Sequence, residues 1–443
     1  MTRRAHQVRV AGVCVAALLL AAAVARADDA ASATDTQKLL DRIKQLEDKV
    51  NDLEGKSTQV VTQASITGKS LDFLGQVEMS GFVSTSYLYD FSRSSGTTPV
   101  AGRLYDDNNN SFTVNKFKLA LEKPVSQDPT NWNAGFRTDL IVGQDAPATH
   151  SSGLFGGPGS TQDIDLEQAF VEINIPIGTG LKLSVGKTVT LMGVEVIEEV
   201  SNPNFSEGNQ FIYVENFTQT GVQAAYQWTP IIDTEFVIFN GWDALPDNNS
   251  QKSFMGRLGI APDANTDIGL IGFGGVEQAG DNGNWRDGAE IVVNRNKLFT
   301  DKLNAWLQLD YGHEENAPQA DLSGATPAVE PNADWYAAGI WTTYDFTDKV
   351  ELAIRVDYLK DQKGVRTPFT TDGNAANPAP VTTAGEFSEA PKQLMSLTGT
   401  LNYKPFGNLQ VRPELRYDRA EDKYAFDNKR DQITAAVSVA YLF

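Results

Sequence analysis

The most unusual chemistry in this 443-residue sequence lies in one acidic segment. Between Thr188 and Gln251 there is no Lys or Arg, whereas carboxylates recur at short intervals. Five of them lie in the first half of this segment: Glu195, Glu198, Glu199, Glu207 and Glu215. Carboxylates gathered on one loop create an electric field if basic side chains lie opposite them. The alternative is an acidic loop that is simply solvated.

Basic side chains that could oppose these carboxylates occur in segments with a period of two, which is typical of strands. In "NLQVRPELRYD" and "VELAIRVDYLK" apolar residues alternate with charged ones, and "NWNAGFRTDLIV" and "NKFKLALEK" show the same pattern. The basic residues on the charged faces are Lys116, Lys118, Arg137, Arg355, Arg412 and Arg416. If the acidic loop folds against these faces, the two sets would line a constriction that sorts solutes by charge.

Groups for catalysis or cofactor binding are scarce. Beyond the first 27 residues the only histidines are His150, in an expected long loop, and His313, at the loop end of an expected strand, and there is no cysteine. A His/Cys metal cluster is therefore excluded, and a Ser–His pair would need a chance loop contact. The Gly-rich stretches "GLFGGPGS" and "GFGGVEQAG" lack a phosphate-loop Lys and open no helix. We expect neither enzyme activity nor a cofactor.

The elements that position these residues are strands. From Leu74 onward the pattern predicts about sixteen, most of them as long as the ~9–11 residues of a tilted membrane strand. Their expected ranges are 74–91, 111–123, 130–142, 163–175, 180–190, 217–228, 232–243, 251–261, 265–278, 287–298, 302–314, 334–346, 348–360, 390–404, 408–419 and 431–443.

The connections between these strands alternate in length. Short turns such as "PIGT" and "PFG" alternate with long loops such as 191–216 and 361–389. An antiparallel barrel in an outer membrane has this pattern, with tight turns on one side and long loops on the other. The sequence therefore predicts an all-β fold, a transmembrane up-and-down barrel. A charged inner face cannot form a dry core, so we expect a water-filled lumen.

The last strand ends on aromatic residues. In "DQITAAVSVAYLF" Tyr441 and Phe443 belong to the apolar face, and Phe443 is the last residue of the sequence. Such a residue resembles the C-terminal signature that outer-membrane assembly machinery reads. We therefore expect Tyr441 and Phe443 to act as an assembly signal.

The N-terminal part carries different patterns. Residues 1–27 combine a basic start, an apolar run and a small-residue site, which predicts a cleaved secretory signal. Residues 28–55 form an expected periplasmic segment, and residues 56–73 a linker to the barrel at 74–443. The segment 28–55 has a short coiled-coil seam, or alternatively an amphipathic helix lying on its own domain. The seam residues are Leu39, Ile43, Leu46, Val50 and Leu53.

Charge and hydropathy exclude other classes. A formal net charge of −20 argues against nucleic acid as a partner. Mean hydropathy is −0.30, and no stretch after the signal supplies the ~20 apolar residues of a membrane helix.

The segment around the acidic loop resembles the OmpL-like family of outer-membrane β-barrel porins. The resemblance rests on Gln168-Ala169-Phe170, on Gly186-Lys187 and on "NPNFS" at 202–206, and extends over 74–443. Family members often carry His before Thr-Gly, where this chain has Gln219, which leaves the solute open. The resemblance implies a passive pore that is trimeric like other porins, although Ile/Val at a and Leu at d of the seam favour two strands.

These observations predict a porin for small hydrophilic solutes in the bacterial outer membrane, with a weak preference for cations. The expected partners are outer-membrane lipid, the solutes or ions, the assembly machinery and two further copies of the chain. Two alternatives stay open: a barrel that serves as an adhesin or structural protein, and an outer-membrane barrel enzyme.

Overall fold

The computed structural model describes residues 41–49, 73, 75–92, 99–126, 128–157, 160–317, 332–367, 392–421, 425–426 and 429–443. The chain divides into two units, Met1–Gln76 and Val77–Phe443. In the first unit, residues 41–49 are helical, and the side chain of Leu46 is 56% exposed. The expected signal, the rest of the seam (Leu39, Val50 and Leu53) and nearly all of the expected linker lie outside the described residues.

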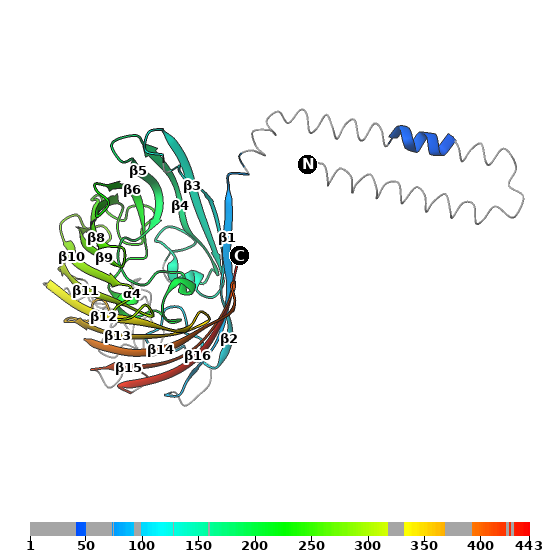
Figure 1. Ribbon diagram of the computed structural model, residues 1–443. Helices are drawn as coiled ribbons and strands as arrows, with labels where there is room; N and C mark the ends of the chain where they lie inside the picture. The colour runs from blue at the N-terminus through cyan, green and yellow to red at the C-terminus, as the bar shows by residue number, and fades with distance from the viewer. Residues whose placement is uncertain are drawn as a thin grey trace, which may run out of the picture. The chain divides into compact units, whose positions relative to one another are not determined.

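The second unit is a closed antiparallel barrel of sixteen strands, shown in Figure 1. The strands are β1 (Glu78–Asp90), β2 (Ser111–Lys123), β3 (Asn133–Val142), β4 (Ile164–Ile175), β5 (Leu181–Val189), β6 (Thr218–Gln227), β7 (Ile232–Phe239), β8 (Ser253–Asp263), β9 (Thr266–Val276), β10 (Trp285–Arg295), β11 (Leu303–Glu315), β12 (Asn332–Thr347), β13 (Val350–Asp361), β14 (Gln393–Phe406), β15 (Leu409–Ala420) and β16 (Asp431–Leu442).

Each strand pairs with its neighbours in sequence, and β1 pairs with β16 to close the ring. The closing register runs from Phe82 opposite Leu442 to Asp90 opposite Thr434. Phe443 continues this seam, because its N–H donates to the carbonyl of Gly81 and its carbonyl accepts the Gly81 N–H, at 2.9 and 3.0 Å. A side chain at position 81 would meet the Phe443 ring and the Lys118 carbonyl, so the close approach requires glycine.

The two faces of the wall differ as the alternation predicts. On β15, Leu415 is 62% exposed, whereas its neighbours Glu414 and Arg416 are buried inside the ring. On β13, Ile354 and Val356 point outward, and Arg355 points inward. A barrel in lipid needs this arrangement, with an apolar outer belt and all strand edges paired. Among the described residues, no helix is both long and apolar enough to cross a bilayer.

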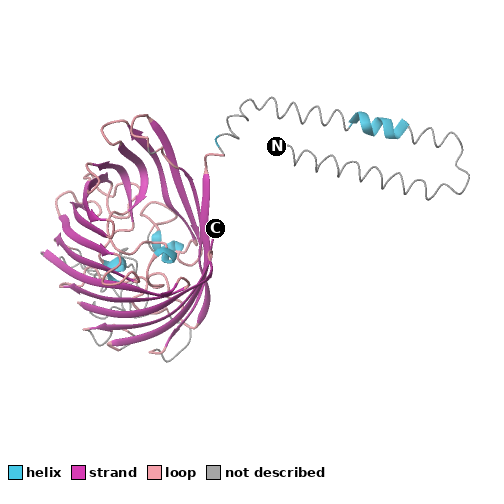
Figure 2. Ribbon diagram, in the orientation of Figure 1, coloured by secondary structure: helices cyan, strands magenta, loops and turns pink. Residues whose placement is uncertain are grey.

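Short helices lie within the ring of strands (Figure 2). They are η1 (Ala146–Thr149), η2 (Glu199–Ser201) and α4 (Asn209–Tyr213). Helix η1 belongs to the loop between β3 and β4, and both η2 and α4 belong to the loop between β5 and β6. We call residues 190–217 the lumen loop.

Candidate functional site

The lumen loop is held inside the barrel by an apolar cluster. Phe211, Ile212 and Tyr213 of α4 are buried in it together with Trp335 of β12 and Leu359 of β13. Helix α4 also contacts β14. A single helical turn is too short to be stable alone, so these tertiary contacts stabilise it. The sequence predicted a long loop at this position. It did not predict that the apolar run "FIYV" at 211–214 packs against the wall.

Glu195 of the lumen loop forms an ion pair with Arg355 of β13. The Nη1 of Arg355 donates to Oε1 of Glu195 at 2.6 Å, and both side chains are at most 1% exposed. The second carboxylate oxygen, Oε2, accepts the Gly208 N–H at 2.6 Å, so the pair also fixes the start of α4. A buried pair of this kind is costly to break, because one charge would remain uncompensated.

Two lysines of β2 hold the next part of the loop. Lys116 Nζ donates to Oε2 of Glu199 at 2.8 Å and to the carbonyl of Ile197 at 2.6 Å. Lys118 Nζ lies among three carboxylates, at 2.9 Å from Asp139, at 2.7 Å from Glu167, and in contact with Glu198. Carboxylate oxygens of Asp139, Glu167 and Glu198 converge closely enough to hold a metal ion. The ammonium of Lys118 occupies that position as the cation.

Two arginines of β15 bind the loop through its backbone. Arg412 Nη2 donates to the carbonyls of Asn202 and Pro203 at 2.7 and 3.0 Å, and Arg416 Nη1 donates to the carbonyl of Glu207 at 2.6 Å. Burial raises the pKa of the Glu207 carboxyl well above its usual value, against the opposing effect of Lys116. Arg137 pairs with Glu122 and Asp139 of the wall and does not reach the loop.

The structure therefore brings most of the expected residues into direct buried contact, as ion pairs or as hydrogen bonds to the loop backbone, rather than as two sets facing each other across water. Lys116, Arg355, Arg412 and Arg416 are all at most 2% exposed. The wall under the loop is thus drier than the water-filled lumen expected from the sequence.

Glu215 belongs to a further acidic group, whose other two members, Glu290 and Asp310, were not predicted from the sequence. Gln308 Nε2 of β11 lies 2.7 Å from a carboxylate oxygen of Glu215, 3.1 Å from Glu290 of β10 and 3.3 Å from Asp310 of β11. Its Oε1 accepts the Val194 N–H, which fixes the amide with its donors toward the acids. None of the three carboxylates has a basic partner among the described residues. Alternation along 287–298 and 302–314 would have placed Glu290 and Asp310 inward.

The inner wall away from the loop is more solvated. Arg257 of β8 pairs with Asp233 of β7 at 2.7 Å and with Asp267 of β9 at 3.1 Å, and these side chains are partly exposed. On β6, Gln223 donates to Glu235 at 2.8 Å. Arg257 lies near the middle of β8, and Asp233, Asp267, Gln223 and Glu235 lie in the half of their strands nearer the short turns. This polar, partly exposed group therefore extends from the middle of the wall toward the short turns.

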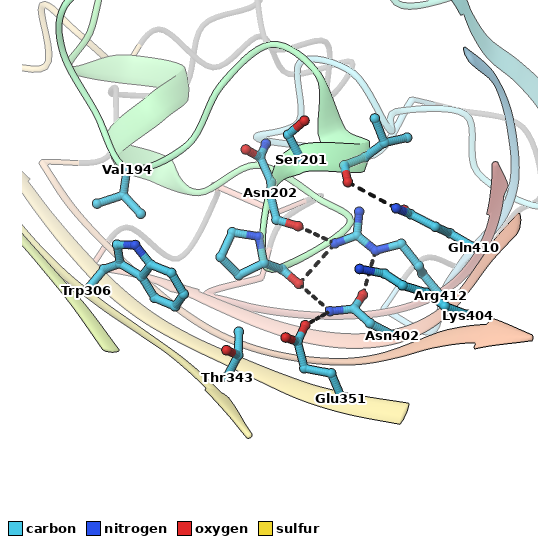
Figure 3. A pocket seen from close by; sticks show the side chains of 12 residues that line it. Val194, Ser201, Asn202, Trp306, Thr343, Glu351, Asn402, Lys404, Gln410 and Arg412 are labelled. Atoms are coloured by element: carbon cyan, nitrogen blue, oxygen red, sulfur yellow. Dashed lines mark hydrogen bonds between the residues drawn. The ribbon is translucent and has the colours of Figure 1, made fainter. Parts of the chain in front are cut away.

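A half-enclosed cavity of about 220 Å³ lies between residues 194–203 of the lumen loop and the inner wall of β11–β15. Figure 3 shows Trp306 on one side of it and Glu351, Asn402 and Arg412 on another. Asn402 links these groups, because its Nδ2 donates to Glu351 at 2.8 Å and its Oδ1 accepts from Arg412 Nε at 2.7 Å. Lys404 and Gln410 complete the polar lining near the short turns.

Comparison with known proteins identifies the family. Residues 76–443 match the model of the family described as putative beta-barrel porin-2, OmpL-like. A search of curated proteins gives no match.

Among solved structures, Pseudomonas putida OprB at high pH is 12% identical, with a TM-score of 0.54 over 86% of this chain and 97% of that one. An anion-selective porin from Comamonas acidovorans is 9% identical, with a TM-score of 0.53 over 83% and 99%. The trimer form of OmpT from Vibrio cholerae is 10% identical, also at 0.53 over 83% and 99%. At such identities the likeness concerns the fold alone. With the family model matched over its whole barrel, the chain belongs to the OmpL-like family of β-barrel porins.

Proposed function

We propose that this porin is a passive channel for small hydrophilic solutes across the bacterial outer membrane. The observation that carries the proposal is that the lumen loop is attached to one side of the lumen, whereas the other side keeps a polar wall. The lumen loop is bound to β2, β13 and β15, and the wall of β6–β9 opposite keeps partly exposed polar side chains. A loop fixed to one side narrows a sixteen-strand barrel without replacing its aqueous path.

The same arrangement supports a weak preference for cations. On the solvated wall Asp233, Glu235 and Asp267 share one base, Arg257. The bases under the lumen loop are already engaged by its carboxylates and carbonyls. Mobile ions therefore meet an excess of negative charge, which raises the local concentration of cations.

The test is the reversal potential in a KCl gradient across a planar bilayer that contains the purified protein. We expect a potential with the sign of potassium preference. We also expect it to shrink when Asp233→Asn and Glu235→Gln are combined, because both carboxylates face the path. A control variant, Asp281→Asn, changes a partly exposed loop carboxylate that caps its own turn and should leave the potential unchanged. Clear anion preference of the wild type would overturn this proposal.

A second candidate is a barrel that does not conduct and uses its long loops as a contact surface. The packing of α4 against Trp335, Leu359 and the other strands supports it, because that cluster fills part of the lumen. Single-channel recording separates the two candidates, since a plugged barrel gives no conductance steps.

The remaining assignments are also proposals. We propose a cleaved signal at 1–27, a periplasmic segment at 28–55, a linker at 56–73 and an association of three copies. OmpT from Vibrio cholerae, which has a similar fold, occurs in a trimer form, and this supports the association. Tyr441 and Phe443 serve assembly, and the position of Phe443 at the closing seam supports that role.

A further inference from the structure

The cavity between the lumen loop and β11–β15 differs in charge from the rest of the chain. Arg412 is 2% exposed, and each group that accepts from it is neutral: the Asn402 amide oxygen and the carbonyls of Glu199, Asn202 and Pro203. Lys404 makes no ion pair with any described residue. Among the described residues, Glu351 is the only carboxylate that lines the cavity. Two cations and one anion thus line a cavity in a chain with a formal net charge of −20.

The polar groups that remain available are mainly donors. The three N–H groups of Lys404, the indole N–H of Trp306 and the hydroxyl of Ser201 have no partner among the described residues, and all three side chains line the cavity. The Oε1 of Glu351 is already bonded to Asn402. A site rich in donors and positive charge recognises a solute rich in acceptors.

The frame of this site is rigid, and one side of it is apolar. Arg412, Asn402 and Asn202 are each at most 5% exposed and are joined by hydrogen bonds, so they do not need to reorganise around a ligand. The indole of Trp306 and the side chain of Val194 lie on the other side (Figure 3). These groups can cover a short aliphatic chain.

The geometry points to a subsite for a small aliphatic carboxylate on the path through the barrel. The carboxylate lies against Lys404, and the carbon chain lies against Trp306. This inference rests on the proposed channel function and adds a solute class to it. The subsite is a local exception to the acidic lumen and does not set the selectivity between potassium and chloride.

Single-channel conductance tests the subsite with lactate as the probe. Potassium lactate is added at fixed KCl concentration and compared with propane-1,2-diol, the uncharged analogue. We expect lactate to reduce the conductance in a saturable way and the diol to have no such effect. Lys404→Gln should raise the half-blocking concentration about tenfold, since one charge-assisted hydrogen bond is lost. Glu351→Gln should lower it, because the only carboxylate of the site loses its charge.

The matched control is Lys349→Gln. Lys349 lies in the neighbouring short turn, donates to the Pro405 carbonyl at 3.0 Å and does not line the cavity, so its variant should block like the wild type. Equal block of wild type and Lys404→Gln would overturn the subsite. A second result would also overturn the subsite: alanine blocks the wild type more strongly than lactate does, and Glu351→Gln abolishes the block by alanine. The site would then select a zwitterion. Conductance steps without saturable block would overturn the subsite but not the channel, whereas absence of steps would overturn both.

Discussion

Val222 and Gln223 are neighbours on β6 that face different surroundings. Val222 points outward and is 45% exposed on the apolar belt, whereas Gln223 points inward and donates to Glu235. The substitution Val222→Arg would place a charge in hydrocarbon and should destabilise the folded barrel by roughly 2–4 kcal/mol. Gln223→Arg would gain an ion pair with Glu235 and should be tolerated. Urea unfolding in lipid vesicles measures both, and equal damage would contradict the assigned faces.

A second prediction at this scale concerns Asp145, which precedes η1 in the loop between β3 and β4. Burial raises the pKa of its carboxyl from 3.8 to about 7, against the opposing effect of Lys116, 3.7 Å away. Because the folded state holds this proton more tightly than the unfolded state, Asp145 reduces stability as pH rises from about 4 to about 7.

Asp145→Asn removes this contribution. Relative to the wild type, the variant should therefore gain stability with rising pH, by up to about 1.4 kcal/mol per pH unit across that window. The measurement is the free energy of unfolding of both proteins at pH 5 and pH 8. A difference between the proteins that does not change with pH would contradict the predicted titration.

At the scale of elements, the lumen loop depends on α4. Phe211 of α4 is buried, with its ring centroid 4.9 Å from that of Phe217 and 6.2 Å from that of Tyr105. Phe211→Ala would leave a cavity and weaken the loop's attachment by about 3–5 kcal/mol. We expect a larger or noisier single-channel conductance. Val196→Ala, at an exposed position of the same loop, is the control. Identical recordings from both variants would show that α4 does not limit the path.

The strands could be predicted from the sequence, but the contacts of the loop could not. All sixteen strands occur with ends within four residues of those expected, and β2 coincides with the expected range of 111–123. Alternation is a local property that a strand carries in its own residues. The basic partners of Glu195 and Glu199, which are Arg355 and Lys116, lie more than 80 residues away in sequence, so only the closed ring brings them together. Helix α4 has one turn, too short for a helical period to appear.

At the scale of the whole molecule, the ring is closed by its first and last strands. Phe443 adds two backbone hydrogen bonds with Gly81 and a stacked contact with Phe117, with ring centroids 6.4 Å apart. Deleting Phe443 removes all three, and we expect a smaller fraction of the protein to reach the heat-modifiable, folded form on gels. Phe443→Tyr keeps the backbone bonds and the ring, and should migrate normally. Normal migration of the deletion variant would contradict a role for this residue in assembly.

The ion pairs and hydrogen bonds of the lumen loop also have a mechanical consequence. One loop is tied to β2 through Lys116, to β13 through Arg355 and to β15 through Arg412. A ring of sixteen strands can flatten into an ellipse under lateral pressure with little change in its own hydrogen bonds. A loop that is attached to these strands from within resists that flattening. The lumen should therefore keep its cross-section in bilayers of different tension.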